Sequence, residues 1–125
     1  MFHAPQDPVS DVQRLLEEAL VLFRGGRHAR AEERIAEALL DDPQSVDALN
    51  LLGVVRNAAG RAAEALAPLE AARRLAPDNP GVLANFGMVL RALGRLPEAL
   101  AAYDRVLVLN PDYAPAHASR ASGLF

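Results

Sequence analysis

The 125-residue chain contains no cysteine, no lysine and no threonine. Without cysteine, a disulfide framework, a thiolate metal site and a thiol nucleophile are all excluded. Without lysine, a phosphate-binding P-loop is excluded, because that motif needs its lysine to reach the phosphates. The missing residue types therefore remove several classes of enzyme and metalloprotein.

Charge is nearly balanced and has one unusual feature. All 13 basic residues are arginine, against 16 acidic residues, so that the net charge is −3, and both signs alternate along the chain. A nucleic-acid-binding protein needs a basic face to neutralise phosphates, so we expect no nucleic acid partner. Arginine without lysine suggests a high-GC genome and hence a bacterial source.

No apolar run in the sequence approaches the length that crosses a bilayer, and we expect no membrane insertion. The first eight residues lack the basic and apolar stretches of a secretory signal. We therefore expect a cytoplasmic protein.

Residues capable of catalysis or metal binding do not form a recognisable motif. His3, His28 and His117 lie far apart and show no metal-ligand spacing. Adjacent acids such as Glu17 and Glu18 diverge on a helix rather than converge on a substrate. We predict no catalytic residue, no cofactor and no metal, and therefore that the chain is not an enzyme.

The most informative pattern is an internal repeat. Pro43, Pro77 and Pro111 follow one another at intervals of 34 residues. The same interval relates other sets of residues: Gly26, Gly60 and Gly94; Arg27, Arg61 and Arg95; Ala31, Ala65 and Ala99; Ile35, Leu69 and Tyr103; Ala19, Gly53 and Gly87; Leu15, Leu49 and Leu83. A fixed period of this length is typical of helical repeat arrays.

These residues resemble the tetratricopeptide repeat (TPR), which has a small residue at a close helix contact, a glycine turn, an alanine, a large apolar residue and a closing proline. Three repeats fit, at 12–45, 46–79 and 80–113, with the first helix of a fourth at 114–125 and a lead-in at 1–11. The resemblance implies one domain over 1–125. Its fold would be an all-α, right-handed α-solenoid of antiparallel helix pairs, with about seven helices.

Local signals define the ends of the expected helices. Pro8 can begin the first helix, Ser45 can cap the third, and Asn79 with Pro80 can open the fifth. Gly53 and Gly87, set against Ala65 and Ala99, are expected to let paired helices approach closely.

Two residues of the second repeat do not fit the family pattern. Pro68 falls inside the expected fourth helix, where it removes the hydrogen bond to the Glu64 carbonyl and predicts a kink. Arg56 occupies a slot that is usually apolar, and we expect its stem to pack while its guanidinium reaches solvent.

The resemblance also implies a concave groove lined by the first helix of each repeat, which holds a peptide or a partner helix. The residues that match this lining are Gln13, Leu16, Leu20, Phe23, Asp47, Asn50, Val54, Asn57, Ala84, Asn85, Met88 and Arg91. Phe23 and Met88 could contact an apolar side chain, while Asn50, Asn57 and Asn85 could hydrogen-bond a peptide backbone.

One family subtype holds a terminal carboxylate with lysines, asparagines and an arginine. The matching positions here carry Leu16, Leu20, Leu51, Gly81 and Asn85, so this clamp is missing. An acidic chaperone tail is therefore a disfavoured partner.

We expect a non-catalytic interaction module or scaffold that binds a protein or peptide partner in the groove. Two alternatives remain: a substrate-presenting N-terminal arm of a larger enzyme such as a glycosyltransferase, and a self-assembling scaffold. The segment 114–125 would cover the sixth helix and leave its own outer side uncovered. We therefore expect either the front piece of a longer protein or a homo-oligomer through this helix.

Overall fold

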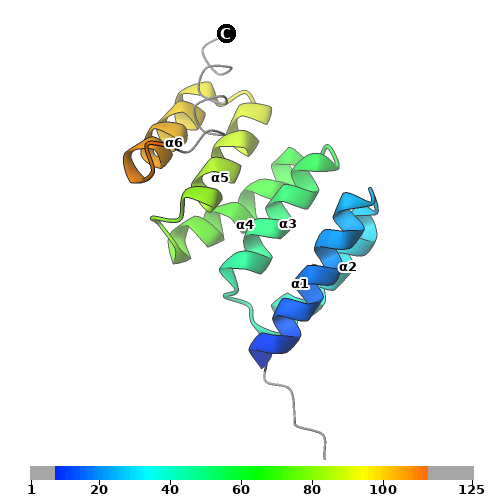
Figure 1. Cartoon of the computed structure of the whole chain (residues 1–125). Helices are drawn as coiled ribbons and strands as arrows, with labels where there is room; N and C mark the ends of the chain where they lie inside the picture. Colours follow the sequence, from blue (N-terminus) through cyan, green and yellow to red (C-terminus); the bar gives the residue numbers. More distant parts are fainter. Residues whose placement is uncertain (1–7, 113–125) are drawn as a thin grey trace, which may run out of the picture.

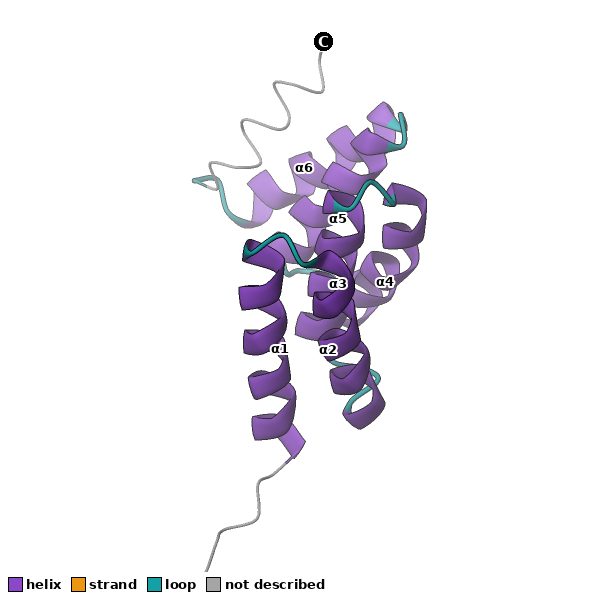
Figure 2. Ribbon diagram, turned by 90° about the vertical axis from the view of Figure 1, so that its right-hand side faces the viewer, coloured by secondary structure: helices purple, strands orange, loops and turns teal. Residues whose placement is uncertain are grey.

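The computed structural model describes residues 8–112. They form six helices in three hairpins: α1 (Pro8–Arg24) with α2 (His28–Asp41), α3 (Val46–Ala58) with α4 (Ala62–Leu75), and α5 (Pro80–Ala92) with α6 (Leu96–Leu109). The hairpins follow one another in a single row (Figure 1). All regular structure within these residues is helical (Figure 2). The seventh helix expected at 114–125 lies outside the described residues.

The helix ends confirm the sequence signals. Ser45 accepts a hydrogen bond from the Ala48 backbone N–H (3.2 Å), and Asn79 accepts one from the Val82 N–H (3.2 Å), so each caps the helix that follows it. Each hairpin turns at a glycine with positive φ, at Gly26, Gly60 and Gly94. That left-handed conformation explains why glycine recurs there.

The helices pack in an order that creates an inner and an outer row. Each hairpin packs within itself, and α2 contacts α3 just as α4 contacts α5. In addition α1 contacts α3 and α3 contacts α5, whereas within residues 8–112 the outer helices α2, α4 and α6 do not contact one another. The first helices therefore form the inner, concave row of an all-α solenoid.

Each repeat contributes one large side chain to the buried core. Ile35, Leu69 and Tyr103, one from each repeat, are fully buried. A Cβ atom added at Gly87 would lie 2.6 Å from Tyr103 Cε1, and one added at Gly53 would meet the Leu69 side chain. The atoms nearest to the two glycines thus belong to these large side chains, which the sequence did not identify as their neighbours.

Pro68 and Arg56 are coupled in a way that the sequence did not predict. Helix α4 continues through the buried Pro68. The Glu64 carbonyl, which Pro68 leaves without its helical donor, accepts a hydrogen bond from Arg56 Nη1 (3.1 Å). Arg56 Nε also donates to Glu32 Oε1 (2.8 Å) on α2. The Arg56 side chain is 28% exposed, so it reaches solvent in part, but it also replaces a missing backbone donor and connects two repeats.

Candidate functional site

The concave face contains a pocket, here called the apolar pocket, among the C-terminal halves of the three inner helices. It has a volume of about 240 Å³ and is lined by Phe23, Val54, Asn57, Ala58, Asn85, Met88 and Val89. One lining residue comes from α1, three from α3 and three from α5. No charged side chain lines it, and Asn57 and Asn85 supply its polar groups. Such a mixture suits an apolar side chain held beside a peptide backbone.

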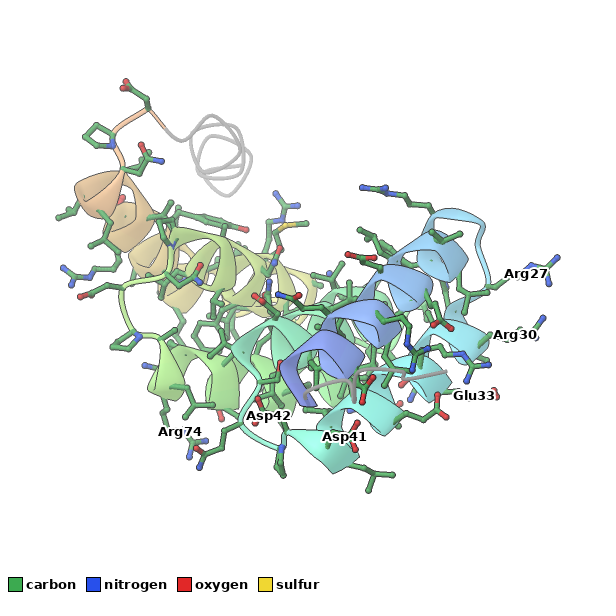
Figure 3. The ribbon with its side chains drawn as sticks, turned by 60° about the horizontal axis from the view of Figure 1, so that its bottom comes forward. Arg27, Arg30, Glu33, Asp41, Asp42 and Arg74 are labelled. Atoms are coloured by element: carbon green, nitrogen blue, oxygen red, sulfur yellow. The ribbon has the colours of Figure 1, made fainter. Side chains whose placement is uncertain are left out.

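A second pocket, here called the acidic pocket, lies where α1 and α3 begin. It has a volume of about 450 Å³ and is lined by Val12, Gln13, Leu16, Asp42, Gln44, Ser45, Val46, Asp47, Ala76 and Asn79. Asp42 and Asp47 are its charged residues, and no arginine lines it. The Asp42 side chain lies at the end of the first hairpin where α1 begins, opposite Arg27 and Arg30 (Figure 3).

A hydrogen bond between inner helices lies between the two pockets. Asn85 Nδ2 on α5 donates to Asn50 Oδ1 on α3 over 2.9 Å. Asn50 lies between Asp47 and Val54 along α3, and hence between the acidic and the apolar pocket. The other half of each side-chain amide, Asn50 Nδ2 and Asn85 Oδ1, has no hydrogen-bond partner within residues 8–112. These two groups therefore remain available to a ligand.

The structure brings most of the predicted groove residues together. Phe23, Val54, Asn57, Asn85 and Met88 meet in the apolar pocket. Gln13, Leu16 and Asp47 meet in the acidic pocket. Leu20 and Arg91 are half-buried and line neither of these two pockets.

Ala84, which was predicted to line the groove, lines neither of these two pockets. It is only 5% exposed and packs in a core cluster with Leu83 and Val106, so it offers almost no surface to a partner. Ala58, which the prediction omitted, is exposed and lines the apolar pocket, and Val89, which is 1% exposed, forms part of its wall from the core. Their signal was present, since each lies one residue from a predicted groove residue, Asn57 or Met88.

A charged network lies behind the groove, between the first and second repeats. Glu32 accepts hydrogen bonds from Arg56 (2.8 Å) and Arg61 (2.5 Å), and Arg61 also pairs with Glu64 (2.8 Å). Partial burial acts to raise the pKa of Glu32, but the hydrogen bonds from the two arginines outweigh it and lower this pKa. The hydrogen bonds to Glu64 and Glu32 raise the pKa of Arg61. The network therefore remains charged at neutral pH and ties α2 to the second hairpin.

Other kinds of site are not evident in the part of the chain that the structure describes. Residues 8–112 contain no group of three or more histidine, aspartate or glutamate side chains arranged to hold a metal ion. Among the same residues, none of the helices combines the length and apolar character that would carry it across a membrane.

Comparison with family models identifies the fold. Two models described as tetratricopeptide repeat match residues 16–80 and residues 56–122. The chain belongs to the tetratricopeptide repeat family. No curated protein matches the sequence.

Solved structures of TPR proteins superpose over nearly the whole chain. The first TPR domain of human RPAP3 is 21% identical, with 94% of this chain and 92% of that chain covered and a TM-score of 0.89. The first TPR of Spaghetti (RPAP3), solved with the HSP90 peptide SRMEEVD, is also 21% identical, with 92% and 91% covered and a TM-score of 0.87. At this identity the likeness shows the TPR fold.

A Thermobaculum terrenum O-GlcNAc transferase mutant is 27% identical, with a TM-score of 0.90. The match covers 97% of this chain but 23% of the transferase chain, so this chain corresponds to a minor part of that enzyme.

Proposed function

We propose that the chain is a non-catalytic interaction module whose concave groove binds a peptide segment or a partner helix. The observation that carries this proposal is the apolar pocket, where side chains from all three inner helices meet around one cavity. A continuous peptide can contact three repeats at once only on such a face. The peptide bound to the TPR of Spaghetti supports the same kind of partner.

Affinity capture from the source organism tests the proposal. The wild-type chain is compared with a groove variant, Asn85→Ala with Met88→Ala, and with the control Leu40→Ala, whose side chain is 82% exposed on the outer helix α2. We expect proteins captured by the wild type and by the control to be lost with the groove variant. If the groove variant captures the same proteins as the wild type, these proteins do not bind in the groove.

The likeness to the O-GlcNAc transferase favours a second role, that of a substrate-presenting arm attached to a larger enzyme. In this role the groove would hold a protein substrate while chemistry took place on another domain. The coding sequence of the full reading frame distinguishes the two roles. A glycosyltransferase domain in the same frame supports the arm, and its absence supports the independent module.

A further inference from the structure

The two pockets of the concave groove differ in charge, and this difference specifies a ligand. The acidic pocket contains Asp42 and Asp47 without a cation. The apolar pocket contains no charge. Arg91 lies one turn beyond Met88 on α5 and forms no ion pair within residues 8–112. The groove therefore passes from a negatively charged pocket to an uncharged one.

The carboxylates of the acidic pocket are available for a ligand. Asp42 uses Oδ1 to accept the Gln44 backbone N–H (3.1 Å), which leaves its other oxygen. Asp47 is exposed and accepts no hydrogen bond from the rest of residues 8–112. Arg14, which follows Gln13 of the lining, pairs with Glu18 (2.7 Å), and Arg74, two residues before Ala76 of the lining, pairs with Glu70 (4.0 Å). A basic side chain of a partner would supply the missing counter-charge.

The distance between the two pockets determines how many residues separate the basic and the apolar side chain of a ligand. Asp47 and Val54 are seven residues apart on α3, which corresponds to about 10 Å along a helix axis. An extended chain covers this distance in about three residues. The free Asn50 amide group lies between them and can donate to the backbone of such a peptide.

We propose that the groove selects an extended peptide with an arginine or lysine about three residues from a large apolar residue. The apolar side chain enters the pocket of Phe23, Val54 and Met88, and the basic side chain lies against Asp42 and Asp47. This preference rests on the proposed groove function and is opposite in charge to the acidic HSP90 peptide bound by the TPR of Spaghetti.

Selection from a phage-displayed library of random dodecapeptides on the immobilised full chain tests the preference. We expect enriched peptides to share a basic residue about three positions from leucine, isoleucine, methionine or phenylalanine. Enrichment of acidic peptides, or of apolar peptides without a basic residue, would overturn this inference while leaving the groove function intact. No enrichment of any motif would overturn both.

Fluorescence anisotropy on an enriched peptide locates the basic contact. We expect Asp42→Asn and Asp47→Asn each to weaken binding about two- to fivefold, and the wild-type affinity to fall with added salt. Glu33→Gln is the matched control, because it removes one negative charge from an exposed position on α2 and should leave the affinity unchanged. Equal weakening by all three variants would indicate a general charge effect and overturn the assignment of the basic contact.

Discussion

The side chains of Asn50 and Asn85, which are 35 positions apart in sequence, share a 2.9 Å hydrogen bond across the concave face. The bond joins the inner helices of the second and third repeats at the point between the two pockets. It fixes the spacing of α3 and α5 and orients the remaining amide groups. The floor of the groove is thus partly ordered before any ligand binds, which lowers the entropic cost of binding.

A double-mutant cycle on this pair should show coupling. Asn50→Ala and Asn85→Ala each remove the same hydrogen bond, so the double variant should lose less stability than the sum of the single variants. We expect a coupling free energy of about 0.5–1.5 kcal/mol, measured by urea denaturation. Asn50→Ala combined with Asn57→Ala serves as the control, since these side chains share no hydrogen bond and should be additive. Additivity in both pairs would show that the Asn50–Asn85 bond does not contribute to stability.

Pro68→Ala should reduce the loss of stability that follows from substituting Arg56. In the wild type, Arg56→Met removes the donor to the Glu64 carbonyl together with the contact to Glu32, and we expect a loss of about 1.5–3 kcal/mol. With alanine at position 68, the new backbone N–H can bond the same carbonyl. The cost of Arg56→Met should then fall by about 1 kcal/mol in urea denaturation.

Pro97→Ala provides the matched proline control for this cycle. Pro97 lies in the first turn of α6, where a backbone N–H has no helical acceptor. The cost of Arg56→Met should therefore be the same with proline or alanine at position 97. An unchanged cost in the Pro68→Ala background as well would contradict the role of Arg56 as a substitute donor.

Glu32 should make the stability depend on pH. The pKa of Glu32 in the folded chain lies below its ordinary value, so the unfolded chain binds more protons in this range. The stabilisation from Glu32 is complete above about pH 4.5 and is lost as the pH falls through the folded pKa. The difference in unfolding free energy between the wild type and Glu32→Gln should therefore shrink on acidification.

The exposed pair of Arg95 with Glu98 gives a comparison for the pH experiment. The hydrogen bond that Arg95 donates to Glu98 lowers the pKa of Glu98, but the Glu98 side chain is 55% exposed. Solvent screens such a pair, so Glu98→Gln should change stability less than Glu32→Gln at neutral pH. Urea denaturation of both variants over a range of pH checks this order. A larger effect at Glu98 would contradict the importance of the network between repeats.

The sequence predicted the local structure of the repeats well because each signal acts within a few residues. Gly60 adopts the positive φ that its turn requires, and Asn79 accepts the hydrogen bond of a helix cap. Five of the seven residues in the apolar pocket were among the predicted groove residues, because the resemblance to the TPR family assigns the groove to one face of each inner helix. The resemblance thus predicted most of the residues that line this pocket.

The sequence did not predict how side chains meet across elements. Ala84 lies on the predicted groove face but packs with Leu83 and Val106, and the period does not show how closely α5 and α6 approach. Arg56 reaches a carbonyl on the antiparallel helix, a contact set by the conformation of a long side chain. The available signal was an arginine in an apolar slot twelve positions before a proline within a helix.

Gly87 should tolerate no side chain while Tyr103 faces it. An added methyl group would lie 2.6 Å from Tyr103 Cε1, and the fully buried ring has little room to move. Alanine normally stabilises a helix interior by about 0.5–1 kcal/mol relative to glycine, but overpacking costs about 1–3 kcal/mol. We expect a net loss of about 1–2 kcal/mol for Gly87→Ala in urea denaturation.

The reason for this loss can be isolated with a second substitution. In a Tyr103→Ala background the ring is absent, so Gly87→Ala should become neutral or stabilising. Gly25→Ala is the matched control, because its new Cβ would meet only the Val21 and Leu22 carbonyl oxygens at an ordinary 3.5 Å. If Gly87→Ala destabilises the chain equally with and without the ring, the glycine is required by the close approach of the helix backbones and not by Tyr103.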